Sequence, residues 1–539
     1  MKINTGILTN IPIITRFISR RRRCKLRLIN KGYRKLKDKD ELIVLSQLKD
    51  ALSKTQLNNS SLLKIPVYQD SFNVELSIRQ YFYTRLLGLS FNESFLYSIG
   101  SEKSFKHPLP KEWRVILTGR GISVDNFSCA VLWRVRSFII WGYETLQGLK
   151  SIYLLFKKQP CLERYTYFDG LHSNNISNNP DAHNILNWYL RWRDENIEIN
   201  SICHGVNGIR DFSLKKVYVV KTDGLPQLKN LSLFKYIAFF VYVSIYSFVC
   251  LFFKPVYGLL LGEVIKIKRV ELARDVDLAR DYLFHNSSPY YRPIWTYLAE
   301  EKGSRILFYF YAAHSDYFYR TYIKESKIKD GHLTGAPWHL MSWPYYLVWN
   351  KFHVNLIKKF DQHNSIIEDV APIWFSSNNV NVNVPLNSIA VFDVTPFNTS
   401  FYITLGLSLD YYIPNIANHF LNDIQKILAQ KGYVMAHKMK RICDNVHKKY
   451  SHNIKMIEVK SNYQQIHPNS DATQLIQKTI ATISIPFTST ALIAKYEGKP
   501  SVYYDPTGLI DRNDVAAQGI QVLIGIDELR EWCKDLESK

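Results

Sequence analysis

Residues 481–504 read ATISIPFTSTALIAKYEGKPSVYY, and this stretch decides the predicted fold of the C-terminal third. It begins with a short β-like apolar run, Ala481 to Ile485. A helical segment from Ala491 to Glu497 follows, and a second apolar run, Ser501 to Tyr504, ends it. A strand, a helix and a strand joined by short polar turns form the unit from which parallel sheets are built. The stretch therefore predicts a parallel α/β domain.

The same alternation continues on both sides of this stretch, from residue 388 to the C-terminus. Short apolar runs predict further strands, and longer segments with one apolar face predict helices. The predicted strands are Ile389–Val394, Tyr433–Ala436, Met456–Val459 and Ile520–Ile524, and the predicted helices are Asn415–Gln430, Ala472–Thr479 and a last one from Asp527. We predict that residues 388–539 form one doubly wound, Rossmann-like domain.

A second alternating region precedes a short polar linker. Its β-like runs are Tyr165–Phe168, Val217–Val220, Ile306–Tyr311 and Ala371–Phe375, and its helix-like runs are Ile185–Trp192 and Tyr345–Phe360. We predict a first Rossmann-like domain over residues 161–378 and a linker at 379–387, within a run rich in asparagine and serine. The predicted fold class is therefore α/β, with two Rossmann-like domains.

An apolar insert interrupts the first domain at residues 232–262. Its centre, Tyr236–Phe253, has 18 residues without a charge between Lys235 and Lys254, which is close to the length that spans a bilayer. A single crossing would put the two halves of one domain on opposite sides of the membrane. Two interpretations remain open: a re-entrant or in-plane membrane helix, and a fully buried core helix.

Positive charge is concentrated in the N-terminal region, residues 1–160, which we expect to be mainly helical. The net charge is +22, and residues 1–150 hold 26 Lys and Arg against 11 Asp and Glu. The densest run, Arg20–Arg27, suits nucleic acid or anionic lipid headgroups. The segment Val131–Lys158 is either a basic, interface-seeking helix or an ordinary amphipathic helix. Apolar segments beside the cations favour lipid, so we predict an anionic membrane surface as a partner and no nucleic acid.

No motif points to a metal or a cofactor. The seven cysteines form no CxxC pair, which argues against a zinc site and a disulfide framework and favours a reducing cytoplasm. The apolar run Ile11–Ile14 is a poor signal peptide, so export is not predicted. Asp275-Val276-Asp277 has the DxD pattern of a metal site, but apolar residues at helical spacing around it predict an exposed helix. HExxH and P-loop motifs are absent.

Polar residues follow several predicted strands of the C-terminal domain. Thr488, Ser489 and Thr490 stand where a strand gives way to a helix, and hydroxyls and helix N–H groups suit a phosphate there. A helix cap by Ser489 or Thr490, a turn at Asp393 and a solvated charge run at 437–441 are the open alternatives. The predicted binding residues are Asp393, Thr395, His437, Lys438, His467, Pro468, Thr488, Ser489 and Thr490.

Pro486–Thr490 and the residues up to Pro506 resemble the polysaccharide biosynthesis PFTS-motif proteins. The resemblance extends back through His467-Pro468 and Ala390–Pro396, so it covers residues 388 to 508. It implies a transferase of surface carbohydrate. Two Rossmann-like domains facing a cleft also resemble the GT-B architecture, in which the C-terminal domain binds the nucleotide-sugar donor. The residues predicted above would then be donor-binding residues.

A looser resemblance is to bacterial GT-B sialyltransferases. Those enzymes hold a CMP-activated donor with a His-Pro pair and a Ser/Thr pair, to which His467-Pro468 and Ser489-Thr490 correspond. Their acidic-Gly motif supplies a base, to which Phe168-Asp169-Gly170 corresponds with one acidic residue instead of two. The resemblance implies Asp169 as the catalytic base, with His172 as the alternative. An aspartate before a glycine is also a common turn.

Together these patterns predict a metal-independent glycosyltransferase without a cofactor. It would transfer a sugar from a nucleotide-activated donor, CMP-linked if the looser resemblance holds, to a growing surface polysaccharide or a lipid-linked glycan. Its predicted place is the cytoplasmic face of the bacterial inner membrane, peripheral or monotopic. Two alternatives remain open: a non-catalytic, membrane-associated scaffold of polysaccharide assembly, and a nucleic-acid-binding protein.

Overall fold

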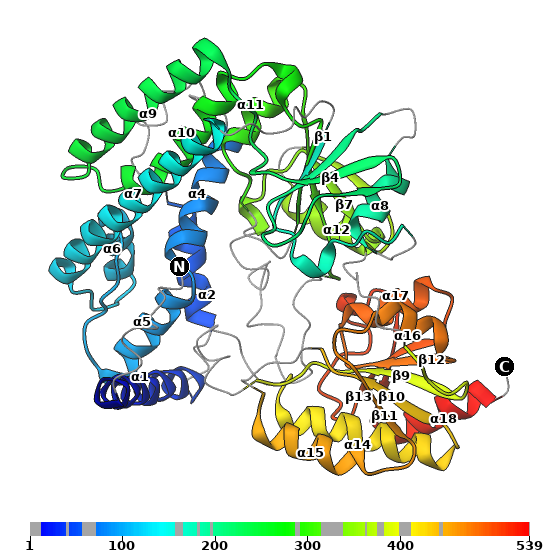
Figure 1. Cartoon of the computed structure of the whole chain (residues 1–539). Coiled ribbons are helices and arrows are strands. Elements are labelled where there is room, and N and C mark those ends of the chain that lie inside the picture. Colours follow the sequence, from blue (N-terminus) through cyan, green and yellow to red (C-terminus); the bar gives the residue numbers. More distant parts are fainter. Residues whose placement is uncertain are drawn as a thin grey trace.

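The protein has a helical N-terminal region and two α/β domains, each built on its own sheet (Figure 1). The computed structural model describes residues 12–38, 43–55, 72–156, 165–180, 184–193, 198–285, 291–313, 338–361, 364–373, 382–397, 411–440 and 446–537. The predicted fold class, α/β with two Rossmann-like domains, is confirmed by the two largely parallel sheets.

The described part of the N-terminal region is helical. Its helices are α1 Pro12–Asp38, α2 Ile43–Ser53, α4 Phe72–Leu86, α5 Leu89–Ser101, α6 Lys111–Gly119 and α7 Asn126–Phe156. Helices α1 and α5 cross at two glycines: a Cβ on Gly32 would lie 2.0 Å from the Leu96 carbonyl oxygen, and one on Gly100 would lie 1.9 Å from that of Leu28. The missing side chains therefore let the two backbones touch.

The first domain contains an eight-stranded sheet in the order β3-β4-β2-β1-β5-β6-β7-β8. Its strands are β1 Tyr165–Phe168, β2 Ser201–His204, β3 Phe212–Leu214, β4 Val217–Lys221, β5 Asp281–His285, β6 Arg305–Tyr309, β7 Tyr345–Val348 and β8 Ile366–Asp369. All neighbours are parallel except β3 and β4. Its helices are α8 Ile185–Trp192, α9 Asn230–Cys250, α10 Tyr257–Glu271, α11 Trp295–Glu301 and α12 Lys351–Phe360.

Two predicted elements of this domain are wrong. The run Tyr345–Phe360, predicted as one helix, is β7 followed by α12, because the Asn350 side chain caps α12 by accepting the N–H groups of Phe352 and His353. The predicted strand Ala371–Phe375 is also wrong: β8 ends at Asp369 and Ala371 has a φ of 63°. Residues 374 and 375 lie outside the described residues.

The predicted helix around Asp275–Asp277 is wrong as well. Helix α10 ends at Glu271, where the Lys302 ammonium donates to the carbonyl oxygens of Glu271 and Ala273 at 3.2 and 2.5 Å. Asp275–Asp277 is a short 3-10 turn, η3, and Leu283 belongs to strand β5. The apolar residues with helical spacing therefore belong to the end of α10, to η3 and to strand β5, and not to a single helix.

The second domain contains a six-stranded parallel sheet in the order β11-β10-β9-β12-β13-β14. Its strands are β9 Ser388–Phe392, β10 Val434–Lys438, β11 Tyr463–Ile466, β12 Ala481–Ser484, β13 Ser501–Asp505 and β14 Gln521–Ile524. Its helices are α14 Pro414–Gln430, α15 Lys448–Glu458, α16 Ala472–Lys478, α17 Ser489–Tyr496 and α18 Gly525–Glu537. The predicted strand Met456–Val459 is wrong, because Tyr450, Ile454 and Ile457 form the buried face of α15.

The apolar insert forms two helices with different surroundings. Helix α10 is buried along most of its length. Helix α9 is, among the described residues, the one helix long and apolar enough to cross a membrane, and 28% of its most apolar window is buried. The interpretation of residues 236–253 as a fully buried core helix is therefore wrong.

Stability is expected to fall in mildly acidic solution because burial strongly lowers the pKa of two histidines. Burial lowers the pKa of His107 to about 4 and that of His285 to about 4. In the unfolded chain the two histidines bind protons with a pKa near 6.5. Above that pH both histidines are neutral whether the chain is folded or not, and their stabilising contribution to the free energy of unfolding is complete. It is lost as the pH falls toward 4, by about 3 kcal/mol for each histidine.

Urea unfolding at about pH 7.5 and about pH 5 measures this loss. The midpoint should be lower at the acidic pH. His107→Gln should shrink the difference between the two midpoints, whereas His419→Gln, at an exposed position of α14, should not. Equal midpoints for the unsubstituted protein would show that the histidines titrate normally in the folded state.

Candidate functional site

Each sheet has one point at which strand addition switches direction. In the first sheet β1 lies between β2 and β5, and in the second sheet β9 lies between β10 and β12. Ligand crevices of open α/β sheets lie beyond the carboxyl ends of the strands at such points. Asp169 and His285 stand there in the first domain, and Asp393 and Pro486–Thr490 stand there in the second.

The loop after β12 is held in a strained shape by two tyrosines. Phe487 has a φ of 64°, in the left-handed region that side chains other than glycine rarely adopt. The hydroxyls of Tyr412 and Tyr503 donate to the carbonyl oxygens of Pro486 and Thr488, both at 2.9 Å. These bonds fix the turn and place the first residues of α17 beside the switch point.

Among the described residues, the N-cap residue of α17 provides no side-chain cap. Thr488 is the N-cap residue, but its hydroxyl donates to the Ile485 carbonyl oxygen at 2.9 Å and accepts nothing from the helix. Because α17 begins at Ser489, the alternative in which Ser489 or Thr490 caps a helix at Ala491 is wrong. The first N–H groups of the helix receive no side-chain acceptor from the cap residue, which suits an anion.

The other two hydroxyls of the loop contact protein groups. Thr490 Oγ1 lies 2.9 Å from Ser484 Oγ, at the end of β12. Ser489 Oγ accepts the backbone N–H of Ala313 at 2.9 Å, across the boundary between the two domains. The hydroxyls therefore shape the loop, and backbone N–H groups are the donors that a phosphate would meet there.

A buried polar cluster lies at the carboxyl ends of β9 and β10. The Tyr450 hydroxyl donates to Asp393 Oδ2, and His437 Nε2 lies 3.5 Å from the same oxygen. His437 Nδ1 lies 2.8 Å from the Tyr463 hydroxyl. Among the described residues Asp393 Oδ1 has no hydrogen-bond partner, although Asp393 is only 3% exposed. Unmatched buried polar atoms at a switch point are typical of a ligand site.

Two more predicted residues flank this cluster. Thr395 is buried close to Tyr450. Burial lowers the pKa of the half-buried Lys438, and the charges of Asp471 and Asp393 oppose that shift. Lys438 thus adds a cation at the edge of the sheet where the helix start also favours negative charge.

His467 is not next to the loop after β12, although the resemblance to sialyltransferases implies that both hold one donor. His467 is exposed and follows the edge strand β11, with β10 and β9 between β11 and β12. Three strand spacings of about 4.8 Å separate the two strands. His467 Nδ1 accepts the Asn469 N–H at 3.2 Å, and Pro468 lies half-buried in the same turn.

Asp169 lies at the switch point of the first sheet, directly after β1. Its N–H donates to the carbonyl oxygen of Leu283 on β5 at 2.9 Å. Burial raises the pKa of its carboxyl group, and the positive charge of Lys266 opposes the rise. A carboxyl group of raised pKa that keeps some solvent access is typical of general acid–base chemistry.

One histidine near this turn was predicted and another was missed. His172 is exposed, and its N–H donates to the Asn175 side chain at 2.8 Å. His285, the missed residue, ends β5 and lies against Gly170, where a Cβ would come within 2.6 Å of His285 Nε2. Parallel pairing of β1 with β5 brings the two together. The sequence feature that could have pointed to His285 is its position at the end of an apolar run.

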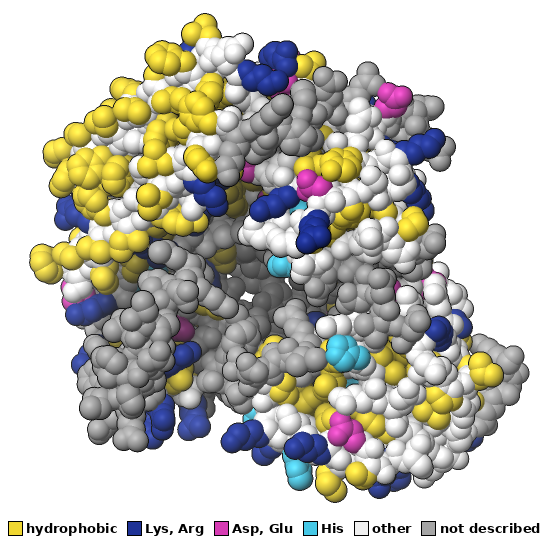
Figure 2. All heavy atoms as spheres, in the orientation of Figure 1, with side chains coloured by type: hydrophobic (Ala, Val, Ile, Leu, Met, Phe, Trp, Pro, Cys, Tyr) yellow, Lys and Arg dark blue, Asp and Glu magenta, His cyan; other side chains and the backbone are white. Residues whose placement is uncertain are grey.

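The carboxyl edge of the first sheet contacts the second domain. Ala313, after β6, donates to Ser489 as described above. Asn350 Nδ2 donates to Gln518 Oε1 at 2.8 Å, and His353 Nε2 lies 3.3 Å from the Gln518 side chain. Figure 2 shows a hollow between the domains and the N-terminal region, with histidine side chains at its margin. The bond between Ala313 and Ser489 therefore joins the carboxyl edge of the first sheet to the loop after β12.

The sequence of residues 234–533 matches the family described as polysaccharide biosynthesis PFTS motif protein. The chain belongs to this family. The matched residues run from α9 into α18 and include the PFTS motif, Pro486–Ser489. In this PFTS protein the motif follows β12, at the switch point of the second sheet. Asp169 precedes the matched residues.

Solved structures with a distant likeness to the PFTS protein were also found. The wall teichoic acid polymerase TagF is 12% identical, with 74% of this chain and 89% of that chain covered and a TM-score of 0.35. The glycosyltransferase of kitacinnamycin is 9% identical, with 71% and 92% covered and a TM-score of 0.35. A protein described as a UDP-N-acetylglucosamine 2-epimerase from Listeria monocytogenes is 8% identical, with 70% and 88% covered and a TM-score of 0.36.

Likenesses at this level do not bear on the chemistry of the PFTS protein. The comparison with curated proteins finds no match. The resemblance to sialyltransferases stays a prediction, as do the roles of the individual site residues.

The two aspartates of the DxD pattern in the PFTS protein form ion pairs with neighbouring basic side chains. Asp275 lies 3.4 Å from Lys302 Nζ, and Asp277 lies 2.7 Å from an Arg274 guanidinium nitrogen. Over the part of the chain that the structure describes, no group of three or more His, Cys, Asp or Glu residues is arranged to hold a metal ion. Metal independence stays a prediction.

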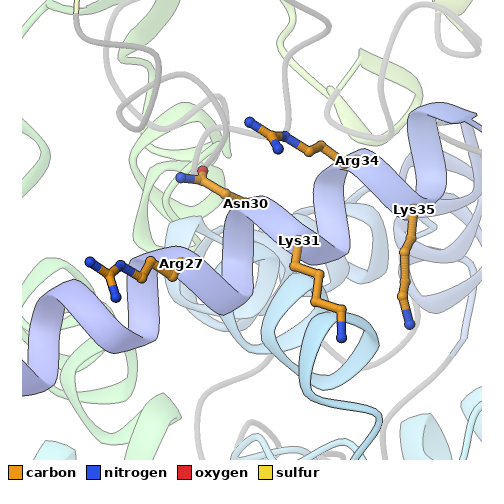
Figure 3. Close-up of a pocket in the computed structure, with 5 residues that line it drawn as sticks. All are labelled: Arg27, Asn30, Lys31, Arg34 and Lys35. Carbon is orange, nitrogen blue, oxygen red and sulfur yellow. The ribbon is translucent and has the colours of Figure 1, made fainter.

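A surface pocket of about 420 Å³ lies along α1 and is lined mainly by cations (Figure 3). Its lining residues are Arg27, Asn30, Lys31, Arg34 and Lys35. Glu102 offsets part of this charge, since Lys31 and Lys35 lie 3.7 and 2.5 Å from its carboxylate. The lining residues that the structure describes come from one helix and include no carboxyl group, so they suit an anion and offer no base for catalysis.

Proposed function

We propose that this PFTS protein is a glycosyltransferase that moves a sugar from a nucleotide-activated donor to a growing surface polysaccharide or a lipid-linked glycan. The main support for the proposal is that each domain has a suitable group at its switch point. The second domain has the uncapped start of α17, and the first has the Asp169 carboxyl group with its raised pKa. Glycosyl transfer uses both, because a phosphate leaves while an acceptor hydroxyl loses a proton.

The second domain is the proposed donor side. The N–H groups at the start of α17 hold the nucleotide phosphates, where the helix dipole favours negative charge. Lys438 contributes a cation, and Asp393 with His437 offers unmatched polar atoms to the nucleoside. His467 and Pro468 lie at the periphery of this proposed donor site, after the edge strand β11. A CMP-linked donor is what the sialyltransferase resemblance implies.

Asp169 is the proposed base on the acceptor side, with His172 as the alternative. In an inverting transfer the acceptor oxygen attacks the anomeric carbon and its proton passes to the Asp169 carboxylate. The bond from that carbon to the phosphate oxygen breaks, and its electron pair stays on the departing phosphate. His285 is a positioning residue, because its ring supports the Gly170 turn from behind.

The proposed place of action is the cytoplasmic face of a membrane, with anionic lipid as a partner and no nucleic acid. Capsule and O-antigen are candidate products. A non-catalytic scaffold is the alternative function. The raised pKa of Asp169 favours an enzyme, since carboxyl groups with shifted pKa values cluster at functional sites.

A thermal-shift screen with CMP, UDP, GDP and their sugars tests the proposal. A ligand that binds only the folded state raises the melting temperature, by an amount equivalent to about 2.7 kcal/mol at a hundredfold excess over its Kd. We expect one nucleotide class to raise it and its sugar conjugate to be hydrolysed or transferred. No shift with any nucleotide, together with no hydrolysis, would leave the scaffold as the better explanation.

A further inference from the structure

We infer that the outward surface of α7 and α9 docks in the plane of an anionic lipid bilayer, and that α9 does not cross it. The inference rests on the proposed function, which needs access to a membrane-bound acceptor, and it names the surface that provides this access. The α7/α9 surface consists of Phe127, Val131, Val135, Ile139, Tyr143, Leu146, Leu149, Tyr153, Phe156, Leu231, Phe234, Val241, Tyr242, Ile245, Phe248, Val249, Phe252 and Phe253.

These side chains form one continuous apolar area. Most of the described large hydrophobic residues that are exposed belong to α7, to α9 or to the turn after α9. On α7 they recur at intervals of three or four residues, and on α9 they also follow the helical period, which places them on one face of each helix. Figure 2 shows hydrophobic side chains gathered over the part of the molecule where Figure 1 places α7 and α9. An apolar area of this extent on a folded chain marks an interaction surface.

Helices α7 and α9 pack side by side, and these contacts hold the apolar surface in one arrangement. A Cβ on Gly148 of α7 would lie 2.3 Å from the Phe240 ring of α9, which shows how closely the helices approach. The Trp141 indole N–H donates to Ser247 Oγ at 3.0 Å, and the Trp141 ring lies 4.9 Å from that of Phe248. Pulling α9 across a bilayer would break these contacts.

The segments before and after α9 are held by contacts with α10 and between α10 and α7. Before the helix, the Asp223 carboxylate pairs with the buried Arg269 of α10 at 2.6 Å, and Arg269 Nε donates to the Pro226 carbonyl oxygen at 2.8 Å. After the helix, a Cβ on Gly258 of α10 would lie 2.4 Å from the Ser137 carbonyl oxygen of α7. Strands β4 and β5, which precede and follow the insert, belong to one sheet. The two ends of α9 therefore lie on the same side of any membrane.

Charge identifies the occupant as an anionic bilayer. Helix α9 has no acidic residue, and the one acidic residue of α7, Glu144, is buried. Exposed cations accompany the apolar residues: Arg134 and Lys150 on α7, Lys235 on α9 and Lys229 before it. Apolar and aromatic residues accompanied by cations bind the boundary between headgroups and acyl chains. A second copy of this chain would bring like charges together at the same surface.

Flotation with sealed vesicles tests the surface. Vesicles of phosphatidylcholine with phosphatidylglycerol should carry the protein upward, and vesicles of phosphatidylcholine alone should carry less. The double variant Leu146→Glu with Ile245→Glu, at sites 65% and 61% exposed, should float at least about tenfold less. Its matched control is Met456→Glu with Val515→Glu, at sites 57% and 59% exposed in the second domain, which should float like the unsubstituted protein.

Three results would overturn the inference. One is no flotation of the unsubstituted protein with either vesicle, and another is equal flotation of the double variant and its control. The third is a dimer in solution that the double variant turns into a monomer, which would assign the surface to a second copy. If the double variant melts lower than the control, the milder Leu149→Gln and Val249→Gln variants, which also must float less, replace it.

Labelling from outside the vesicles tests the in-plane arrangement. Lys229→Cys and Lys254→Cys place thiols before and after α9, and an impermeant maleimide should label both above the level of the unsubstituted chain. Protection of one of them until detergent is added would show that α9 crosses the bilayer. Flotation and labelling need no sugar donor, so they can fail while nucleotide binding persists, and the proposed enzyme activity can fail while flotation persists.

Discussion

Replacement of Asp169 by asparagine is expected to lower the rate of sugar transfer by about 10²–10⁴-fold, the usual contribution of a positioned general base. The amide keeps the size of the side chain and cannot accept the acceptor's proton. Nucleotide binding should not change, because the donor side lies in the other domain. Steady-state rates with a saturating donor and thermal shifts with the nucleotide measure the two effects separately.

A matched control for this variant is Asp275→Asn, which removes an exposed carboxylate of the same domain from its pairing with Lys302. That variant should transfer sugar at the normal rate. Normal transfer by Asp169→Asn would exclude Asp169 as the base, and His172→Gln would then be the variant to measure. Loss of nucleotide binding in Asp169→Asn would instead indicate a structural role.

The same substitution should stabilise the fold. Because burial raises the pKa of Asp169, its ionised form costs stability wherever the pH exceeds that pKa. Asparagine removes this cost, so the variant should melt higher than the unsubstituted protein near pH 7. The gain should vanish below the pKa of the unfolded aspartate, about 3.9, where both states hold the proton. An inactive variant that is also more stable is the pattern of a catalytic group.

The sequence predicted the two sheets well where strands are short, buried and flanked by helices. Ile185–Trp192 coincides with α8, and the β-α-β stretch at 481–504 coincides with β12, α17 and β13 to within two residues. The wrong strand Met456–Val459 shows where this reasoning fails. Met456–Val459 is apolar enough for a strand, but its residues complete a helix face, and the true strand β11 carries two glutamines at the sheet edge.

The site was predicted in part, because strand order is a tertiary property. Asp169, Asp393 and the Pro486–Thr490 loop follow strands next to the switch points, as the rule for open sheets requires. His467 also follows a strand, but nothing in the sequence tells that β11 is at the edge. His285 and Tyr450 were missed, since each becomes part of the site only through parallel pairing or helix packing.

Replacement of Ser489 by aspartate is expected to weaken nucleotide binding about tenfold or more. A carboxylate at the first position of α17 would occupy the field that the helix offers to phosphate, and it would repel a phosphate by a few kcal/mol at the distance of direct contact. The same carboxylate can still accept the N–H of Ala313, and an acidic residue in the first turn stabilises a helix by about 0.3–1 kcal/mol. The variant should therefore melt at or above the normal temperature while its donor KM rises.

Two controls separate the anion site from the domain contact. Ser489→Ala removes the acceptor for Ala313 without adding charge, so it should change nucleotide affinity far less than Ser489→Asp does. Asn415→Asp adds the same charge to the exposed first turn of α14 in the same domain and should leave affinity unchanged. If Ser489→Asp bound nucleotide normally, the phosphates would lie elsewhere on the sheet edge, and the cluster of Asp393, His437 and Lys438 would be the place to look. If Ser489→Ala were as weak as Ser489→Asp, the contact between the domains, rather than the helix start, would control binding.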